Sequence, residues 1–213
     1  MRHARQHAVT HSETRSRERR QHLAIEAARL ISEGGIRDFL LANRKAAERL
    51  GIHDDASLPR NREIQQALRD YQRLFLAQSH SQVLHEHRKA AMRALAFFAE
   101  FEPRLVGGVL DGTADAHSTV CLHLYPDDAK RVPRFLADHQ IPAEASSRRI
   151  RFNRDGCENV SVWLFAADSL PFDITVLPRD ALRQAPFDPI DGKPMRRASL
   201  AALQELLAEP QKW

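Results

Sequence analysis

Apolar residues recur at helical spacing along the first hundred residues of the chain. Leu23, Ala27 and Leu30 fall at positions i, i+4 and i+7, which places them on one face of a helix. The glycines that follow, Gly34 and Gly35, favour a left-handed end to that helix. Three more helices are predicted by apolar positions at similar spacing, namely Phe39, Ala46, Ala47 and Leu50; Ile64, Leu68, Tyr71 and Phe75; and Val83, Ala90, Ala91, Leu95 and Phe98. The chain therefore begins with a helical module.

Residues that terminate or cap helices separate these predicted helices. Gly51 closes the second helix, and turn-forming residues between 52 and 60 predict a loop. Asn61 is a suitable N-cap for the third helix. The fourth helix is expected to end before Pro103, because the residue preceding a proline disfavours helical backbone.

After Leu105 the apolar spacing changes from that of a helix to that of a strand. Val120, Leu122 and Leu124 alternate with less apolar residues, which predicts a strand. The remaining pattern predicts a helix at 127–139, an edge strand at 149–152, central strands at 160–165 and 172–177, a loop at 178–198 and a final helix capped by Ser199. Helices and strands in this order predict an α+β fold.

Composition places the chain among ordinary globular proteins. Of 213 residues, 43% are hydrophobic and 28% are charged, so the chain is neither fibrous nor disordered as a whole. Its cysteines, Cys121 and Cys157, are too few for a disulfide scaffold. No apolar run approaches the ~20 residues of a membrane span, and the N-terminus lacks the apolar segment of a secretory signal. We expect a soluble, cytoplasmic protein.

The net charge of +4 is concentrated at the N-terminus. Two glutamates, Glu13 and Glu18, oppose the arginines of the first 22 residues, which are Arg2, Arg5, Arg15, Arg17, Arg19 and Arg20. Because residues 1–20 contain almost no large apolar side chains, we expect a disordered tail or a frayed extension of the first helix. Such a tail is typical of a solvated terminus. It would also suit the phosphates of RNA or DNA, or an acidic protein partner.

A glycine pair followed by hydroxyl residues forms the most informative motif. Gly107 and Gly108 leave the apolar run at 105–110, and a polar loop then leads to Ser118 and Thr119 at the next strand. Glycines allow backbone N–H groups to approach a phosphate closely, since no Cβ intervenes. Hydroxyl groups can donate further hydrogen bonds to the same ligand. This combination of residues is the part of the sequence that carries a resemblance to a known family.

With this order of motifs, residues 81–178 resemble the nucleotidyltransferase-fold superfamily, the polymerase-beta-like group. In that family a Gly-Gly or Gly-Ser pair is followed, after about ten residues, by two aspartates on one strand face and a third carboxylate on a later strand. Asp173 stands where the third carboxylate would fall. The whole chain also has the look of a small bacterial family.

The resemblance implies a domain at 81–213 with a mixed or antiparallel sheet and flanking helices. The helical module at 21–80 would be packed on this domain or linked to it. The resemblance also implies that Mg²⁺ and a nucleoside triphosphate are bound, with Asp173 as metal ligand and catalytic residue. It implies as well that the nucleotide contacts Gly107, Gly108, Ser118 and Thr119. Carboxylates on one strand face can together hold divalent metals, which activate the attacking hydroxyl and neutralise the leaving group.

The chain departs from the family pattern at the positions of the first two aspartates. Thr119 and Cys121 occupy them, and neither supplies a charged oxygen ligand for Mg²⁺. We therefore predict a pseudoenzyme that binds nucleotide, with catalysis lost or altered. An active nucleotidyltransferase remains an alternative, in which Asp111 or Asp115 would replace the missing carboxylates.

Basic residues before the final helix form a second candidate phosphate site. Lys193, Arg196 and Arg197 precede Ser199, where cationic side chains and a helix N-terminus could together hold a phosphate. A solvated basic loop is the alternative interpretation. A further hypothesis for the chain is a non-catalytic binding module, in which the helical module and the arginine-rich tail contact nucleic acid or a protein partner.

Overall fold

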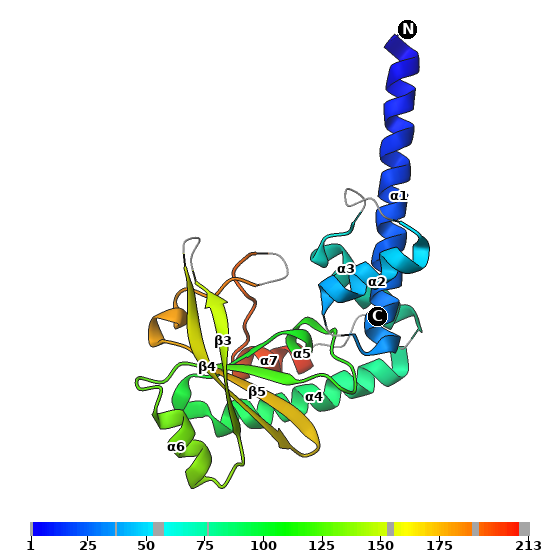
Figure 1. Cartoon of the computed structure of the whole chain (residues 1–213). Helices are drawn as coiled ribbons and strands as arrows, with labels where there is room; N and C mark the ends of the chain where they lie inside the picture. Colours follow the sequence, from blue (N-terminus) through cyan, green and yellow to red (C-terminus); the bar gives the residue numbers. More distant parts are fainter. Residues whose placement is uncertain are drawn as a thin grey trace. The chain divides into compact units, whose positions relative to one another are not determined.

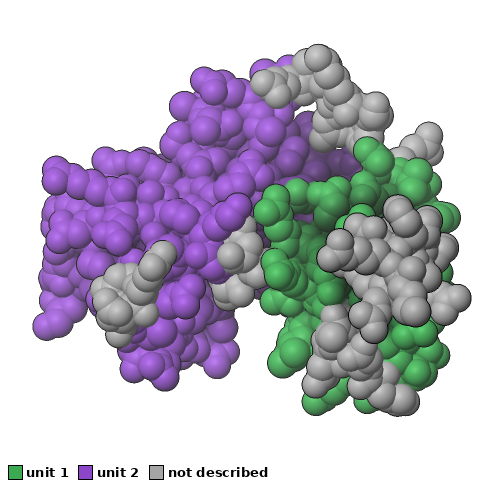
Figure 2. Space-filling model, turned by 90° about the horizontal axis from the view of Figure 1, so that it is seen from above, with its two compact units in different colours: residues 1–77 green, residues 78–213 purple. Residues whose placement is uncertain are grey.

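The computed structural model describes residues 2–36, 38–52, 58–75, 77–152, 156–188 and 192–208, with side chains from residue 16 onward except those of 77–79. Figure 1 shows the course of the chain. The chain forms two compact units, Met1–Ala77 and Gln78–Trp213, which are coloured separately in Figure 2. Most of the predicted loop at 52–60, and Asp191 of the predicted loop at 178–198, lie outside the described residues.

The first unit is a three-helix arrangement built on small residues. Its helices are α1 (Arg2–Gly34), α2 (Phe39–Leu50) and α3 (Asn61–Phe75). They share a core of small and aliphatic side chains, namely Leu23, Ala24, Ala27, Ala42, Ala46, Ala47 and Ile64. Alanines at these positions allow close approach of the helices. The basic residues of the N-terminus continue the first helix, because α1 begins at Arg2 (Figure 1).

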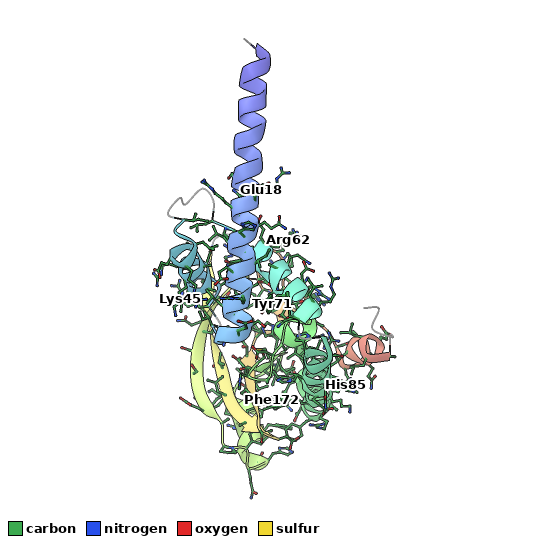
Figure 3. All side chains as sticks on the ribbon, turned by 90° about the vertical axis from the view of Figure 1, so that its right-hand side faces the viewer. Glu18, Lys45, Arg62, Tyr71, His85 and Phe172 are labelled. Carbon is green, nitrogen blue, oxygen red and sulfur yellow. The ribbon has the colours of Figure 1, made fainter. Side chains whose placement is uncertain are left out.

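Polar contacts define the ends of these helices and join α3 to α1. Asp38 caps α2 by accepting hydrogen bonds from the N–H groups of residues 40 and 41, and Gly51 ends it in the left-handed conformation. The predicted cap at Asn61 is displaced by one residue. Asn61 is the first helical residue of α3, and the N–H of Arg60 donates to the Glu63 carboxylate at 2.7 Å. Tyr71, labelled in Figure 3, donates a hydroxyl hydrogen bond to Glu33.

The second unit combines helices with a five-stranded mixed sheet, which confirms the α+β class. Its elements are α4 (Ala77–Phe97), η2 (Ala99–Phe101), β1 (Arg104–Val106), α5 (Gly108–Asp111), β2 (Val120–Leu124), α6 (Arg131–Asp138), β3 (Glu144–Arg151), β4 (Cys157–Ala167), β5 (Leu170–Val176), η3 (Arg179–Leu182) and α7 (Leu200–Ala208). The strand order is β1-β2-β5-β4-β3, in which β2 and β5 are parallel and the other pairs are antiparallel.

The strands agree with the sequence pattern, but β3, β4 and β5 are longer than predicted. The strand predicted at 149–152 is the edge strand β3, but it begins already at Glu144. β4 and β5 are joined by a tight turn at Asp168 and Ser169, both with positive φ. The helix predicted at 127–139 begins at Arg131, because a turn around Asp128 precedes it. Ser199 caps α7 as predicted, since its Oγ accepts from the N–H of residue 202 at 3.3 Å.

The two faces of the sheet differ in character. On one face, alternate residues such as Leu122 and Ile174 pack against α4, α6 and α7 in the main hydrophobic core. The other face has a small apolar cluster at one end, made of Tyr125, Ile150, Val160, Leu177 and Ala181. At its other end lie Cys121, His123, Arg148, Asp173 and Thr175, which we call the polar face. Strand alternation places these five residues on the side opposite the main core.

Candidate functional site

The glycine pair makes the turn from β1 into α5. Gly107 adopts φ 73° and ψ −156°, a conformation that L side chains rarely take. A Cβ on Gly107 would lie 3.9 Å from the Cβ of Cys121, so the turn lies against this side chain of β2. Gly108 has no positive φ and begins α5. Of this glycine pair, only Gly107 has a backbone conformation that requires glycine.

Side chains from α4 position the loop that follows the glycine pair. Arg88 is 6% exposed, and its Nε donates to the carbonyl oxygen of Val109 at 3.1 Å. The Nε2 of His87 lies 3.1 Å from the carbonyl oxygen of Ser118, at the far end of the same loop. These contacts fix both ends of the loop from one helix. The sequence pattern did not indicate this role, since a basic residue on an amphipathic helix is usually exposed.

Strand register brings the main predicted site residues together. Cys121 of β2 and Asp173 of β5 are direct partners in the parallel pair, so their side chains share the polar face. Thr119 immediately precedes β2, and its carbonyl oxygen lies 3.6 Å from the Sγ of Cys121. With Gly107 against Cys121, the glycine turn, Cys121 and Asp173 form one row that runs from the end of β1 across β2 to β5.

Asp173 is held by an arginine that the sequence pattern did not identify. Arg148 projects from β3 across β4, and its Nη2 lies 2.5 Å from Oδ2 of Asp173. Its Nη1 lies 3.4 Å from Oδ1 of Asp173 and 3.3 Å from the hydroxyl of Thr175. The Thr175 hydroxyl also donates to Oδ1 at 3.2 Å. Asp173 is 7% exposed, and both of its carboxylate oxygens accept hydrogen bonds from protein groups.

A signal for Arg148 exists in the sequence once β3 is given its full length. Arg148 and Ile150 are two residues apart, so they share a strand face, and Ile150 faces the apolar cluster of the sheet. The strand predicted from residue 149 excluded Arg148 by one position.

His123 is buried beside the Arg148–Asp173 ion pair, and its Nδ1 has no hydrogen-bond partner among the described residues. The residue is 3% exposed and is the register partner of Thr175. Burial, followed by the nearby charges of Arg197 and Arg148, lowers the pKa of His123 to about 4. The ring is therefore neutral near pH 7 and has one nitrogen that can accept a hydrogen bond.

The other predicted phosphate ligands do not converge. The Oγ of Ser118 donates to Asp115 Oδ1 at 2.8 Å and accepts from the Asp115 N–H at 2.8 Å, so this hydroxyl stabilises a local turn. Arg196 pairs with Asp111 at 2.9 Å. Arg197 instead donates to the carbonyl oxygen of Ala181 at 2.6 Å and to the Tyr125 hydroxyl at 3.0 Å.

The predicted cluster before α7 is consequently divided, because two of its three basic residues point to different elements. Arg196 contacts α5, whereas Arg197 holds η3. Lys193 contributes its carbonyl oxygen to the N–H of Asp188 at 2.7 Å, a contact within its own loop.

The donor set of this region does not fit a divalent metal. Among the residues that the structure describes, no three His, Cys, Asp or Glu side chains gather as a metal site. Asp111 pairs with Arg196, and Asp115 accepts from Ser118, so both of these carboxylates are engaged with other groups. Mg²⁺ prefers several oxygen ligands in octahedral geometry, and Asp173 alone supplies too few.

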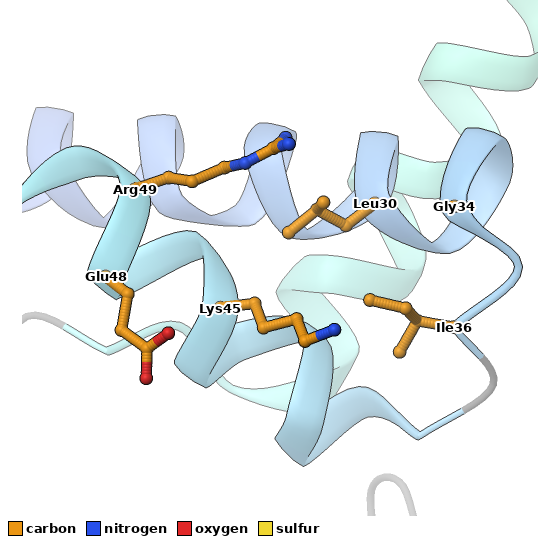
Figure 4. Close-up of a pocket in the computed structure, with 6 residues that line it drawn as sticks. All are labelled: Leu30, Gly34, Ile36, Lys45, Glu48 and Arg49. Atoms are coloured by element: carbon orange, nitrogen blue, oxygen red, sulfur yellow. The ribbon is translucent and has the colours of Figure 1, made fainter.

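A separate hollow in the first unit lies beside the end of α1 and along α2 (Figure 4). Its lining consists of Leu30, Gly34, Ile36, Lys45, Glu48 and Arg49. Arg49 is already paired with Glu26 at 2.9 Å. The hollow is more apolar than polar and lacks the convergent polar groups of the polar face, so it is the weaker candidate for a charged ligand.

No protein-family model matches this chain, and no curated protein or solved structure is significantly similar to it. Within the described residues, no helix is sufficiently long and apolar to cross a membrane.

Proposed function

We propose that this protein is a nucleotidyltransferase-like nucleotide-binding protein whose catalysis has been lost or altered. One observation carries the proposal: Gly107, Cys121 and Asp173 form a single row across neighbouring strands. The resemblance implies a glycine pair, a strand that follows it and a carboxylate on a later strand, and these three residues would supply those features. Cys121 and Cys157 are thiols rather than a disulfide, which suits the reducing cytoplasm that we propose as the protein's location.

The charge of the polar face supports a phosphate-containing ligand. Arg148 and Arg197 are both close enough to His123 to lower its pKa, and Arg148 also pairs with Asp173. With His123 neutral, the two guanidinium groups are the positive charges beside this ring. A triphosphate is the part of a nucleotide that such a charge would attract.

Ordinary two-metal nucleotidyl transfer is not supported by the residues at this site. Thr119 and Cys121 lack carboxylates, and Arg148 already occupies both oxygens of Asp173. Two-metal transfer needs ligands that clamp both ions. An active transferase would therefore require groups other than Asp111 and Asp115, which have other partners.

A thermal-shift panel tests nucleotide binding directly. ATP, GTP, CTP and UTP are each added to the full chain with Mg²⁺, with Mn²⁺ or with EDTA. A ligand at about one hundred times its Kd stabilises the folded protein by about 2.7 kcal/mol, which raises the Tm measurably. Adenosine, which lacks phosphates, is the control and is expected to give a smaller rise than ATP. If no nucleotide raises the Tm under any metal condition, the proposal is wrong.

The second candidate function is binding of nucleic acid or an acidic partner through residues 1–22. The favouring observation is that this arginine-rich segment is part of helix α1 from Arg2 onward. We expect the triple variant Arg2→Gln, Arg5→Gln and Arg15→Gln to weaken oligonucleotide binding in fluorescence anisotropy. A plot of the logarithm of the binding constant against the logarithm of the salt concentration should become shallower. Its slope should change by about one for each phosphate that the variant no longer neutralises.

A matched control removes the same charge from exposed positions elsewhere. The control triple variant carries Arg62→Gln, Arg134→Gln and Arg149→Gln, all at exposed residues. If both triple variants lose affinity equally, the effect belongs to net charge, and the N-terminal segment has no specific role.

A further inference from the structure

We infer that the guanidinium of Arg148 takes the place that a divalent cation would otherwise have at Asp173, so that the polar face binds a phosphate chain without metal. The inference rests on the proposed function, because it specifies how the same site holds its nucleotide. The residues around Asp173 offer too few oxygen ligands for a divalent metal. Asp173 retains its carboxylate, but a protein cation neutralises it.

The geometry at Asp173 is that of a fork-shaped contact between two charged groups. Both Nη atoms of Arg148 point to the two carboxylate oxygens, and Thr175 supports the contact from the same strand as Asp173. A bidentate guanidinium–carboxylate pair is among the stronger polar contacts in proteins. A metal ion at this carboxylate would have to displace Arg148 and would place two positive charges side by side.

Arg148 keeps donors available for an anion. Its three described hydrogen bonds use only the Nη atoms, and its Nε makes none among the described residues. The Arg148 side chain is 47% exposed, whereas that of Asp173 is 10% exposed. The guanidinium thus has one edge on the buried carboxylate, and its Nε is left for a further acceptor in a side chain that is nearly half exposed. Planar edges of this kind bind phosphate oxygens in a bidentate manner.

His123 provides an independent sign that this face receives a ligand. Its Nδ1 is buried without a partner among the described residues, and buried polar atoms in folded proteins nearly always have one. His123 lies opposite Thr175 in the strand register, and Thr175 in turn contacts Arg148. A ligand hydroxyl or phosphate group beside Arg148 would supply a polar neighbour for this ring.

Isothermal titration calorimetry with ATP and with inorganic tripolyphosphate, in EDTA and in Mg²⁺, tests the inference on the full chain. We expect binding in EDTA to be as strong as in Mg²⁺. Arg148→Ala should weaken it by about tenfold or more, because alanine cannot make a charge-assisted hydrogen bond to phosphate. Arg149→Ala is the matched control and should leave binding unchanged, since Arg149 is an exposed neighbour whose side chain lies on the opposite side of β3.

The variant Asp173→Asn distinguishes phosphate binding by Arg148 from metal binding by Asp173, because the two hypotheses predict opposite changes in affinity. If Arg148 binds the phosphates, loss of the opposing carboxylate should tighten binding in EDTA. If Asp173 holds a metal, the same change should abolish Mg²⁺-dependent binding. The double variant Arg148→Ala with Asp173→Asn removes both charges together, so it leaves no unpaired buried charge if Arg148→Ala alone fails to fold. It should bind more weakly than Asp173→Asn.

The outcomes separate this inference from the proposed function. Binding that requires Mg²⁺, and that is strengthened by Arg148→Ala, overturns the inference while leaving nucleotide binding intact. Absence of binding by both probes in either condition overturns the proposed function and the inference with it. Metal-independent binding that disappears in Arg148→Ala and is kept in Arg149→Ala supports both.

Discussion

Replacing Gly107 with valine is expected to lower the free energy of unfolding of the second unit by about 3 kcal/mol, the upper end of the strain expected for a residue in a glycine-only conformation. The cause is the backbone, since φ 73° with ψ −156° brings a Cβ into conflict with its own chain and a branched side chain adds to that conflict. Urea denaturation followed by tryptophan fluorescence measures the change, because Trp163 lies in β4 of the same sheet.

Gly108→Ala is the matched control for this glycine. Gly108 has no positive φ and begins α5, where alanine is the better helix former. Its new Cβ would lie 3.2 Å from the Thr113 hydroxyl, so a small shift of that side chain is required. We expect a change within about 1 kcal/mol, since the helix preference and the crowding oppose each other. Equal losses in the two variants would show that the conformation of Gly107 is not what the turn depends on.

Acidification is expected to destabilise the second unit through His123. The pKa of His123 is about 4 in the folded protein and near 6.5 when the chain is unfolded. Between these pH values the unfolded state binds more protons than the folded state. The free energy of unfolding is therefore highest above pH 6.5 and falls as the pH decreases toward 4. From pH 7.5 to pH 5 the expected loss from this one group is roughly 2 kcal/mol, at about 1.4 kcal/mol per pKa unit.

A glutamine at position 123 tests this assignment because its amide does not titrate. Urea denaturation at pH 7.5, 6.5, 5.5 and 5 should show a much shallower fall for His123→Gln than for the wild type. A small slope in the same direction is expected to persist, because burial also lowers the pKa of His80. His85, labelled in Figure 3, is exposed on α4, so His85→Gln should keep the full fall. An unchanged slope in His123→Gln would assign the pH dependence to other groups.

The elements predicted best are those whose apolar period and end signals agree. Phe39 and Leu50 bound α2 as its apolar positions and Gly51 indicate. β2 was predicted because Val120, Leu122 and Leu124 alternate with less apolar residues. The edge strand β3 was predicted too short because its exposed residues have little apolar alternation, and edge strands require less of it.

The candidate site was predictable only in part. The resemblance pointed to Gly107 and Asp173, but the residues that contact them could not be predicted from it. Asp173 meets Arg148, a residue 25 positions earlier, because β4 lies between β3 and β5 in the sheet. Arg196 and Arg197 are neighbours in sequence, yet they contact α5 and η3, because side chains of an irregular segment have no common face.

By itself the sequence determined the α+β class and most of the helices and strands. These features depend on local backbone preference and on the period of apolar residues, which neighbouring positions specify. Only the tertiary structure decided that Arg148 neutralises Asp173, that Arg88 supports the glycine loop and that Nδ1 of His123 is buried with no partner among the described residues. Each of these depends on strand order and burial, which bring distant residues together and change the charge of a group through its surroundings.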